Sequence, residues 1–178
     1  MLTKEIEKIK FGDNKISYNI VETEISNFLA IALDGKLVWF DYVKRHNLKN
    51  KLSLFLKRRK GYLVKHEEHI FTKASYQIEE YLARKRDFFE LDIVFFGTDL
   101  QKKVWDCILA IPVGETITYT ELAQKIENPK AIRPAASATA NNTLPIIVPC
   151  HRVVNKNHSK CGYAGGIEIK NMLLDLEK

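Results

Sequence analysis

A cysteine, a histidine and an arginine stand together at Cys150, His151 and Arg152, directly after the apolar run 144–149. A thiol becomes a strong nucleophile only as the thiolate, and a nearby histidine lowers its pKa toward that form. Because adjacent residues of an extended segment point to opposite faces, the contact requires a water relay or a bent backbone. If His151 accepts the proton through water, a carboxylate should hold its other ring nitrogen, and several acids in the sequence remain candidates for this.

Cys150 and His151 allow three further interpretations. Free cysteine is among the most buried residue types, so a lone Cys-His pair is more often structural. Cys150, His151, His158 and Cys161 could bind a metal, but their spacing matches no standard zinc pattern, and we predict no metal and no cofactor. A cysteine hydrolase would need a preformed oxyanion hole and direct contact of the histidine with the thiol, which adjacency disfavours.

The composition is that of a globular protein. The chain has 178 residues, of which 46% are hydrophobic and 28% charged, enough for one large domain or two small ones. No stretch has the ~18 consecutive apolar residues of a membrane span, and the first residues lack the apolar core of a signal peptide. Three cysteines are too few for a disulfide framework. We therefore expect a cytoplasmic protein.

The charge favours a polyanionic partner. The net charge is +6, with a pI near 9.1, which bears on association and not on fold. The run Lys57-Arg58-Arg59-Lys60 could be a nucleic-acid patch, but a short basic cluster is more often a solvated face.

The first part of the chain predicts a small antiparallel sheet and a helix. Two apolar stretches, 28–33 and 36–40, flank Asp34-Gly35, which suits a type I′ hairpin turn. Residues from about 17 to 42 should therefore form antiparallel strands. Helical spacing over 75–84 closes this region. We place the domain boundary near 92 to 98, giving an N-terminal α+β domain over 1–92 and a C-terminal domain over 93–178.

The second part predicts short helices. Apolar residues recur at helical steps from Leu100 to Leu109. Thr118-Tyr119-Thr120-Glu121 has the pattern of a capping box at the start of another helix. A helix rich in small residues follows over 130–140, which suggests a helix-turn-helix, and a last helix is expected from about 166 to 177. The fold class is α+β, with a mainly helical C-terminal domain carrying a winged-helix-like helix-turn-helix.

The sequence around Cys150 resembles a known family. Val148-Pro149-Cys150-His151-Arg152-Val153 is similar to the active-site signature of the O6-alkylguanine-DNA alkyltransferases, in which Pro-Cys-His-Arg is the most specific element. Further motifs follow in the family's order: the helix Leu100–Trp105, the loop Ile111–Tyr119, the start of the recognition helix at Asn128–Arg133 and the C-terminal block Gly162–Glu177. The resemblance covers about residues 98 to 177, with weaker matches at 77–82 and 86–89.

The resemblance implies a direct-reversal DNA-repair reaction and a role for each matching residue. Cys150 would accept the alkyl group of O6-alkylguanine irreversibly, with His151 as water-mediated base and Glu177 orienting His151. Tyr119 would protonate the departing guanine near N3, with Lys170 as a second candidate to help. Transfer from O4-alkylthymine is left open.

The remaining matches would bind DNA and the flipped base. Arg133 would fill the gap left by the extruded nucleotide, and a helix lined by alanines would approach the minor groove closely. The DNA-contacting residues would be Arg133, Ala135, Ala136 and Tyr119, with Ala131 and Ala138 on the same helix. The base pocket would be formed by Asn142, Val153, Tyr163 and Ala164, with the carbonyls of Cys150 and Val153 binding the exocyclic amine of guanine.

Three residues depart from the family pattern. Pro134 stands where alanine is usual, which is harmless only in the first helical turn, and Leu100 and Thr143 replace phenylalanine and proline. The resemblance implies a monomer that acts on double-stranded DNA, with no obligate protein partner. The alternative is a non-catalytic alkyltransferase-like lesion-binding protein, in which the acceptor cysteine is replaced. The presence of Cys150 argues against it.

Overall fold

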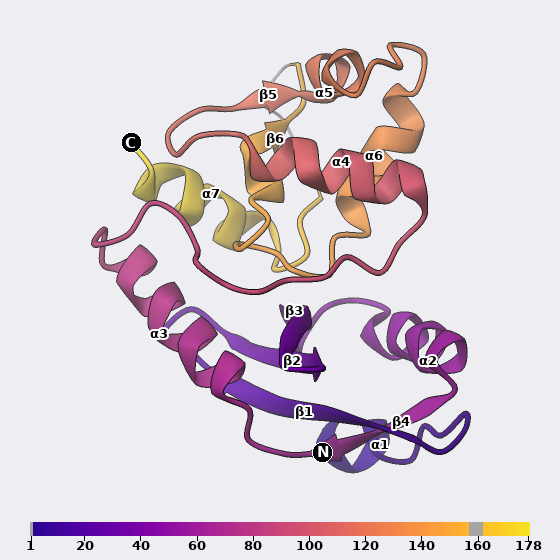
Figure 1. Ribbon diagram of the computed structural model, residues 1–178. Coiled ribbons are helices and arrows are strands. Elements are labelled where there is room, and N and C mark those ends of the chain that lie inside the picture. Colours follow the sequence, from indigo (N-terminus) through magenta and orange to yellow (C-terminus); the bar gives the residue numbers. More distant parts are fainter. Residues whose placement is uncertain (1, 157–161) are drawn as a thin grey trace. The chain divides into compact units, whose positions relative to one another are not determined.

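The computed structural model describes residues 2–156 and 162–178, and its contacts divide the chain into two compact units (Figure 1). The first unit comprises the described residues of Met1–Glu79 and Glu90–Val94, and the second those of Glu80–Phe89 and Phe95–Lys178. Residues 90–94 return to the first unit because Leu37 donates to the Asp92 carbonyl and accepts from the Val94 amide. A single cut after residue 92 therefore does not describe these units.

The first unit is built on a four-stranded sheet in the order β3-β2-β1-β4. Strands β1 (Asn14–Glu22), β2 (Asn27–Leu33) and β3 (Lys36–Tyr42) are antiparallel neighbours, as predicted for residues 17 to 42. Asp34 and Gly35 have φ angles of 52° and 73°, the two positive values that a type I′ turn requires. Strand β4 (Gly61–Lys65) pairs in parallel with β1, so the sheet is mixed and not purely antiparallel.

A helical crossover explains the parallel strand, since parallel neighbours cannot be joined by a hairpin. Helix α2 (Leu48–Arg59) leads from β3 to β4 and buries Leu48, Leu52, Phe55 and Leu56. The first unit also contains α1 (Leu2–Ile6) and most of α3 (His69–Leu82), which begins six residues before the predicted position 75.

The second unit is mainly helical. Its elements are α4 (Asp99–Leu109), β5 (Ile117–Thr118), α5 (Tyr119–Lys125), α6 (Ile132–Ala140), the 3-10 helix η1 (Cys150–Arg152), β6 (Val153–Val154) and α7 (Ile167–Leu176). Helices α4, α5 and α6 contact one another. The capping box at Thr118 and Glu121 is confirmed. None of the helices in the described part of the chain is both long and apolar enough to cross a membrane.

Helix α6 begins late enough to accept Pro134. Its N-cap is Ala131, so Pro134 is the third helical residue, and the amide that proline lacks would have no partner inside the helix. The first helical hydrogen bond runs from the Ala135 amide to the Ala131 carbonyl, at 2.8 Å. The unusual proline thus leaves Arg133 in the first turn of α6.

Candidate active site

The three chemically active residues share one turn of 3-10 helix, η1. The Arg152 amide donates to the Pro149 carbonyl at 2.9 Å, and the Cys150 amide donates to the Val148 carbonyl at 2.7 Å. The backbone is therefore bent here, one of the two solutions that adjacency of Cys150 and His151 required. Cys150 is 6% exposed and His151 is fully buried.

A buried carboxylate holds one ring nitrogen of His151. The distance from His151 Nε2 to Glu177 Oε1 is 2.8 Å, and both side chains are almost inaccessible to solvent. Glu177 caps the C-terminal end of α7, so the carboxylate left open by the sequence is the residue that the resemblance implied. The other nitrogen, Nδ1, has no hydrogen-bond partner among the described residues. With its proton on Nε2, the imidazole keeps a lone pair on Nδ1.

Opposed effects set the protonation of this pair. Burial lowers the pKa of His151, and its hydrogen bond to Glu177 only partly counteracts this, so the imidazole is neutral at neutral pH. Burial alone would raise the pKa of Glu177, but hydrogen bonds from His151 and Arg152 lower it to about 2. A neutral base oriented by an ionised carboxylate is the result.

Arg152 and Tyr81 fix the position of Glu177. Arg152 Nε lies 3.1 and 3.0 Å from the two carboxylate oxygens of Glu177, and Nη2 lies 2.9 Å from Oε1. The hydroxyl of Tyr81 donates to Oε1 and lies 3.4 Å from His151 Nε2. Burial raises the pKa of Tyr81, as does its hydrogen bond to Glu177, so it remains a donor. Neither residue was assigned a role from the sequence, although both stand in motifs of the resemblance.

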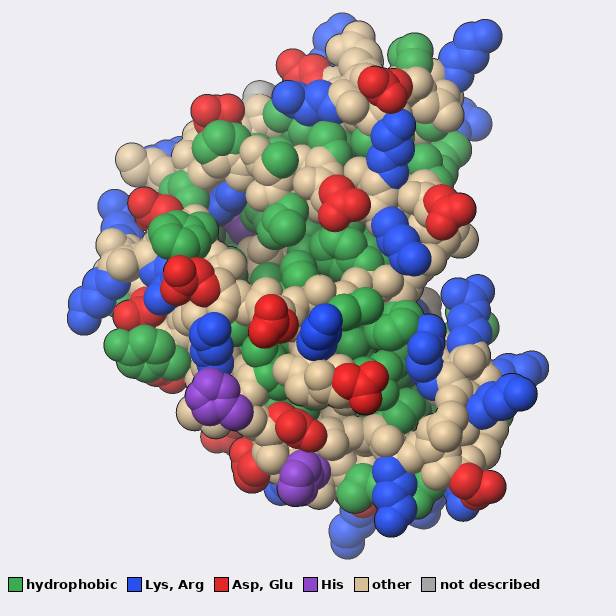
Figure 2. Space-filling view, viewed as in Figure 1, with side chains coloured by type: hydrophobic (Ala, Val, Ile, Leu, Met, Phe, Trp, Pro, Cys, Tyr) green, Lys and Arg blue, Asp and Glu red, His purple; other side chains and the backbone are tan. Residues whose placement is uncertain are grey.

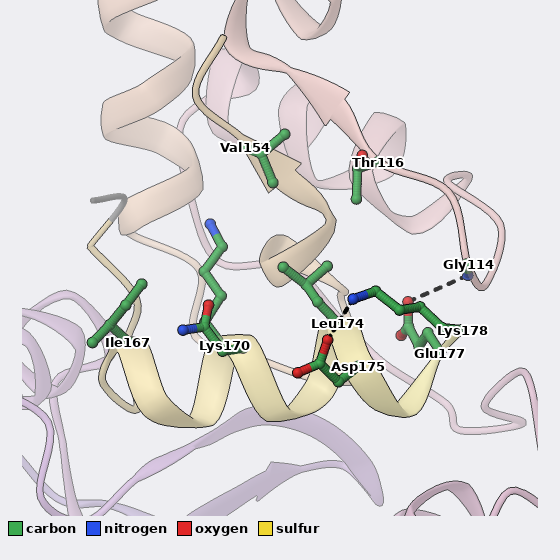
Figure 3. A pocket seen from close by; sticks show the side chains of 10 residues that line it. Gly114, Thr116, Val154, Ile167, Lys170, Leu174, Asp175, Glu177 and Lys178 are labelled. Carbon is green, nitrogen blue, oxygen red and sulfur yellow. Dashed lines mark hydrogen bonds and ion pairs between the residues drawn. The ribbon is translucent and has the colours of Figure 1, made fainter. Parts of the chain in front are cut away.

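Gly114 completes the surroundings of Glu177. Its amide donates to Oε2 at 3.4 Å, a contact visible in Figure 3. The φ angle of Gly114 is 79°, and a Cβ added there would lie 3.1 Å from the Glu177 carbonyl oxygen. Both facts favour glycine in this loop.

Lys170 is buried beside η1 and is not exposed at the surface. It is 3% exposed, and its Nζ donates to the Val153 carbonyl at 2.8 Å. In Figure 3 its side chain extends from α7 toward the strand that carries Val154, along a cavity of about 450 Å³. The Val153 carbonyl, which we expected to bind guanine, therefore already accepts one hydrogen bond and keeps a second lone pair.

The expected pocket residues are distributed around the turn. Asn142 is buried, and its Nδ2 donates to the Val148 carbonyl at 2.9 Å, which ties the segment after α6 to the run before Cys150. The ring of Tyr163 meets that of His151 edge-on, with centroids 6.2 Å apart. Tyr119 opens α5 and is half-buried, as is Ala164.

The predicted DNA-contacting residues differ in exposure. Arg133 is exposed in the first turn of α6, and Ala136 is half-buried. Ala135 is fully buried, so its side chain is not exposed to DNA, and the close approach of the helix backbone that we expect at this residue stays a prediction. The buried positions 131, 135, 138 and 139 follow helical spacing and form the inner face of α6. Ala135 therefore belongs to the packing of the helix.

The zinc alternative gains no support from the described residues. No group of three His, Cys, Asp or Glu side chains converges within residues 2–156 and 162–178. His158 and Cys161, which that alternative also needs, lie outside the described residues.

The fold and the site together define a class of proteins in which a cysteine is adjacent to a neutral, carboxylate-oriented histidine in a mainly helical unit. Comparison with known proteins narrows this class. The sequence model of the family described as "6-O-methylguanine DNA methyltransferase, DNA binding domain" matches residues 99–178.

Two relatives and one solved structure extend the match. The methylated-DNA–protein-cysteine methyltransferase of Methanosarcina acetivorans is 46% identical over 110 residues, which cover 62% of this chain and 70% of the relative. The probable methylated-DNA–protein-cysteine methyltransferase of Acanthamoeba polyphaga mimivirus is 38% identical over 175 residues, 98% of this chain and 95% of the relative. The crystal structure of Mycobacterium tuberculosis OGT in complex with DNA matches with a TM-score of 0.77 at 30% identity, covering 90% and 92% of the two chains.

The chain belongs to the O6-alkylguanine-DNA alkyltransferase family, the methylated-DNA–protein-cysteine methyltransferases. Its function is direct-reversal DNA repair, and its activity is that of a methylated-DNA–protein-cysteine S-methyltransferase with DNA as partner.

Proposed function

We propose that Cys150 is the alkyl acceptor, and that each molecule repairs one O6-alkylguanine. The observation that carries this assignment is the hydrogen-bonded pair of His151 and Glu177, which begins at the residue next to Cys150. In the reaction the Cys150 Sγ forms a bond to the alkyl carbon as the bond from that carbon to O6 breaks, and the bonding electrons stay with guanine. The product thioether has no easy leaving group, so the transfer is irreversible.

The proton of the Cys150 thiol would pass through one water molecule to Nδ1 of His151. The neutral ring offers its lone pair there because Nε2 keeps its proton toward Glu177. The imidazolium that forms is stabilised by the ionised carboxylate, whose pKa is held at about 2. His151 thus acts as the base, and Glu177, Arg152 and Tyr81 act as positioning residues.

Guanine must leave as a neutral base, which requires a proton donor near N3. We assign this donor to Tyr119, at the start of α5. The strand pairing of Ile117 with Val153 supports the assignment, because it joins the segment before Tyr119 to the residue after η1. Lys170 would assist by orienting the Val153 carbonyl, which would bind the exocyclic amine of guanine together with the carbonyl of Cys150.

A lesion inside a duplex must be extruded before it reaches Cys150, at a cost of a few kcal/mol. Arg133 supports this step because it is exposed on the first turn of α6 and has a flat polar head able to stack in the vacated space. Ala136 allows close approach to the minor groove. Asn142, Val153, Tyr163 and Ala164 would form the pocket for the flipped base.

Double-stranded DNA containing O6-alkylguanine is the proposed substrate, and action as a monomer in the cytoplasm stays a prediction. A duplex with one O6-methylguanine tests the assignment, with peptide mass mapping of the protein afterwards. We expect a stable methyl group on the peptide that contains Cys150, and none on that of Cys107, the other cysteine outside disulfides among the described residues. A hydrolase would leave the protein unmodified, and a methyl group on any other residue would contradict the assignment.

A further inference from the structure

Charge is strongly segregated within the first unit. Between Tyr42 and His66 the sequence has nine Lys or Arg residues and no Asp or Glu, whereas the rest of this unit has six Lys or Arg and twelve Asp or Glu. The basic segment coincides with α2 and the residues that flank it. Figure 2 shows Lys and Arg side chains gathered at lower right, around the place of α2 in Figure 1.

Part of this charge is neutralised inside the unit. Arg45 pairs with the buried carboxylate of Asp41, and Lys49 pairs with Glu5. Lys57, Arg58 and Lys60, in contrast, are exposed and form no ion pair with any of the residues that the structure describes. These three residues at the end of α2 are called the α2 basic cluster below.

Capping of the helix does not account for the cluster. Basic side chains at a helix C-terminus often bind the last carbonyls, but here other groups do so. The side chain of Asn14 donates to the Arg59 carbonyl at 2.8 Å, and the Asn14 amide donates to the Lys60 carbonyl at 3.2 Å. Lys60 itself adopts the left-handed cap conformation, with its amide bonded to Leu56 and Lys57. The charged heads of the cluster are therefore left to the solvent.

The geometry of α2 points to a polyanion and not to a membrane as the partner. The apolar face of the helix, Leu48, Leu52, Phe55 and Leu56, is buried in the protein and cannot enter a bilayer, which an interfacial helix requires. The outward face places Lys57 and Arg58 three and four residues after Leu54, on one side of the helix. A group of long cationic side chains on one exposed surface suits the phosphate oxygens of a nucleic-acid backbone.

We propose that the α2 basic cluster is a second DNA-binding surface, which contacts backbone phosphates independently of sequence and adds to the contacts made by α6. This proposal rests on the proposed function only in taking DNA as the polyanion, since no residue of the cluster belongs to the reaction site. Each phosphate contact releases counterions from the DNA, so the affinity falls as the salt concentration rises. Each contact steepens the plot of log K against log salt by about 0.9.

Two triple variants with the same net charge test the proposal. K57Q/R58Q/K60Q removes the cluster, and K4Q/K8Q/K36Q removes three exposed lysines elsewhere in the first unit. Each is measured by fluorescence anisotropy on an undamaged duplex over a series of salt concentrations. We expect the cluster variant to bind about tenfold more weakly at ~0.1 M salt and to lose up to about 2.7 from the salt slope. The control should retain the wild-type slope.

Equal weakening in the two variants would overturn the proposal, because net charge alone would then explain the effect. Transfer from free O6-benzylguanine to the protein separates this outcome from a failure of the proposed function. That reaction requires no DNA, and we expect the same rate in the wild type and in both variants. If the free base fails to react with the wild type, the assignment of Cys150 is at fault, whereas the DNA-binding comparison still stands.

Footprinting of the wild-type protein avoids any effect of substitution on folding. Acetic anhydride labels exposed lysines, and duplex DNA should protect Lys57 and Lys60 while Lys4, Lys8 and Lys36 react as before. Equal labelling of Lys57 and Lys60 with and without DNA would overturn the proposal. So would binding to phosphatidylserine vesicles that depends on the cluster, if duplex binding does not, because the surface would then belong to a membrane.

Discussion

Glu177 accepts hydrogen bonds from Tyr81, which lies 96 positions earlier in the sequence, and from the consecutive residues His151 and Arg152. Each donor stabilises the ionised carboxylate, and this matters because Glu177 follows the last residue of α7, where helix ends fray. The residue that orients the base is thus held by these side chains in addition to the hydrogen bond from its own amide to the Leu173 carbonyl, at 3.2 Å. Substitutions of single residues should distinguish the residues that take part in the reaction from those that position them.

Replacement of Cys150 by serine should abolish transfer and preserve DNA binding. The nucleophile is 6% exposed and contributes little to an interface dominated by the DNA backbone. Mass spectrometry after exposure to methylated duplex reports the transfer, and anisotropy reports the binding. A methyl group found on another residue of the serine variant would show that the assignment is wrong.

His151→Asn and Glu177→Gln should slow the reaction to different degrees. Loss of the base should cost on the order of 100-fold, and loss of its orienting carboxylate roughly 10-fold. Both should raise the pKa of Cys150. His151→Asn removes the acceptor of the thiol proton, and Glu177→Gln weakens that acceptor. Thiolate absorbance against pH measures this. Unchanged titration in both variants would rule out the relay.

Tyr81→Phe should change the pH dependence of transfer. The Tyr81 hydroxyl donates to the same oxygen of Glu177 that accepts from His151. Removal of the hydroxyl should therefore strengthen the hydrogen bond from His151 Nε2–H to Glu177. The stronger bond to Glu177 favours the imidazolium and should therefore raise the pKa of His151. A raised pKa leaves less neutral base in acid, so transfer should fall more near pH 6 than near pH 8. Tyr76→Phe, on the exposed side of the same helix, is the control, and a uniform loss at all pH values would mean that Tyr81 is only structural.

At the scale of elements, helix α6 combines an exposed start with a buried face. Arg133 projects from the first turn, while the alanines at 131, 135 and 138 pack inward. The indole of Trp105 in α4 donates to the Ala138 carbonyl at 2.9 Å, which fixes the C-terminal half of α6 against α4. Arg133 is therefore presented on a helix that cannot easily shift.

Arg133→Ala should slow repair of duplex DNA far more than reaction with free O6-benzylguanine. Duplex stacking opposes extrusion of the lesion, and the free base needs no extrusion. Changes at Cys150, His151 or Glu177 act after the base has arrived and should slow both substrates in similar proportion. The ratio of the two rates in each variant is the measurement. If Arg133→Ala slows the free base as much as the duplex, Arg133 belongs to the pocket or the fold.

Local patterns predicted the elements well where the signal was contained in neighbouring residues. The turn at Asp34-Gly35 and the capping box at Thr118 follow from a few adjacent side chains. The parallel pairing of β4 depends on a helical crossover. The hydrophobic pattern of the β4 residues themselves does not predict which strand they pair with. The burial of Ala135 likewise depends on which face of α6 meets the other helices.

The contacts of the site also fall into those that the sequence predicts and those that it does not. The adjacency of Cys150 and His151 can be read directly from the sequence, but the sequence alone left the carboxylate open, and only the resemblance pointed to Glu177. The hydroxyl of Tyr81 meets Glu177 across 96 positions, and nothing local predicts such a contact. Long-range hydrogen bonds are the part of a site that sequence patterns miss.

At the scale of the whole molecule, stability should depend on pH through the site. The folded pKa of Glu177 is about 2, against 4.5 without its partners. A lowered pKa gives stability that is present above pH 4.5 and is lost as pH falls toward 2, by about 3 kcal/mol in total. The lowered pKa of the buried His151 adds a loss that begins below its ordinary value of 6.5, because the unfolded chain binds that proton first.

Urea unfolding at pH 5 and at pH 3 tests this dependence. The wild type should lose more stability between these values than Glu177→Gln, which cannot titrate at that position. Glu24→Gln is a suitable control because that carboxylate is exposed and forms no hydrogen bond or ion pair with the described residues. Equal losses in the wild type and in Glu177→Gln would mean that Glu177 does not contribute.

The chain enters the second unit twice, at Glu80 and again at Phe95, and the first visit contributes Tyr81. This pattern limits how the unit can be inherited. A recombination event that copied only residues 95–178 into another gene would carry Cys150, His151 and Glu177 but leave Tyr81 behind. Such a descendant would keep His151, Arg152 and Gly114 as donors to Glu177, so only an exchange that includes segment 80–89 should preserve the pH dependence of the original reaction.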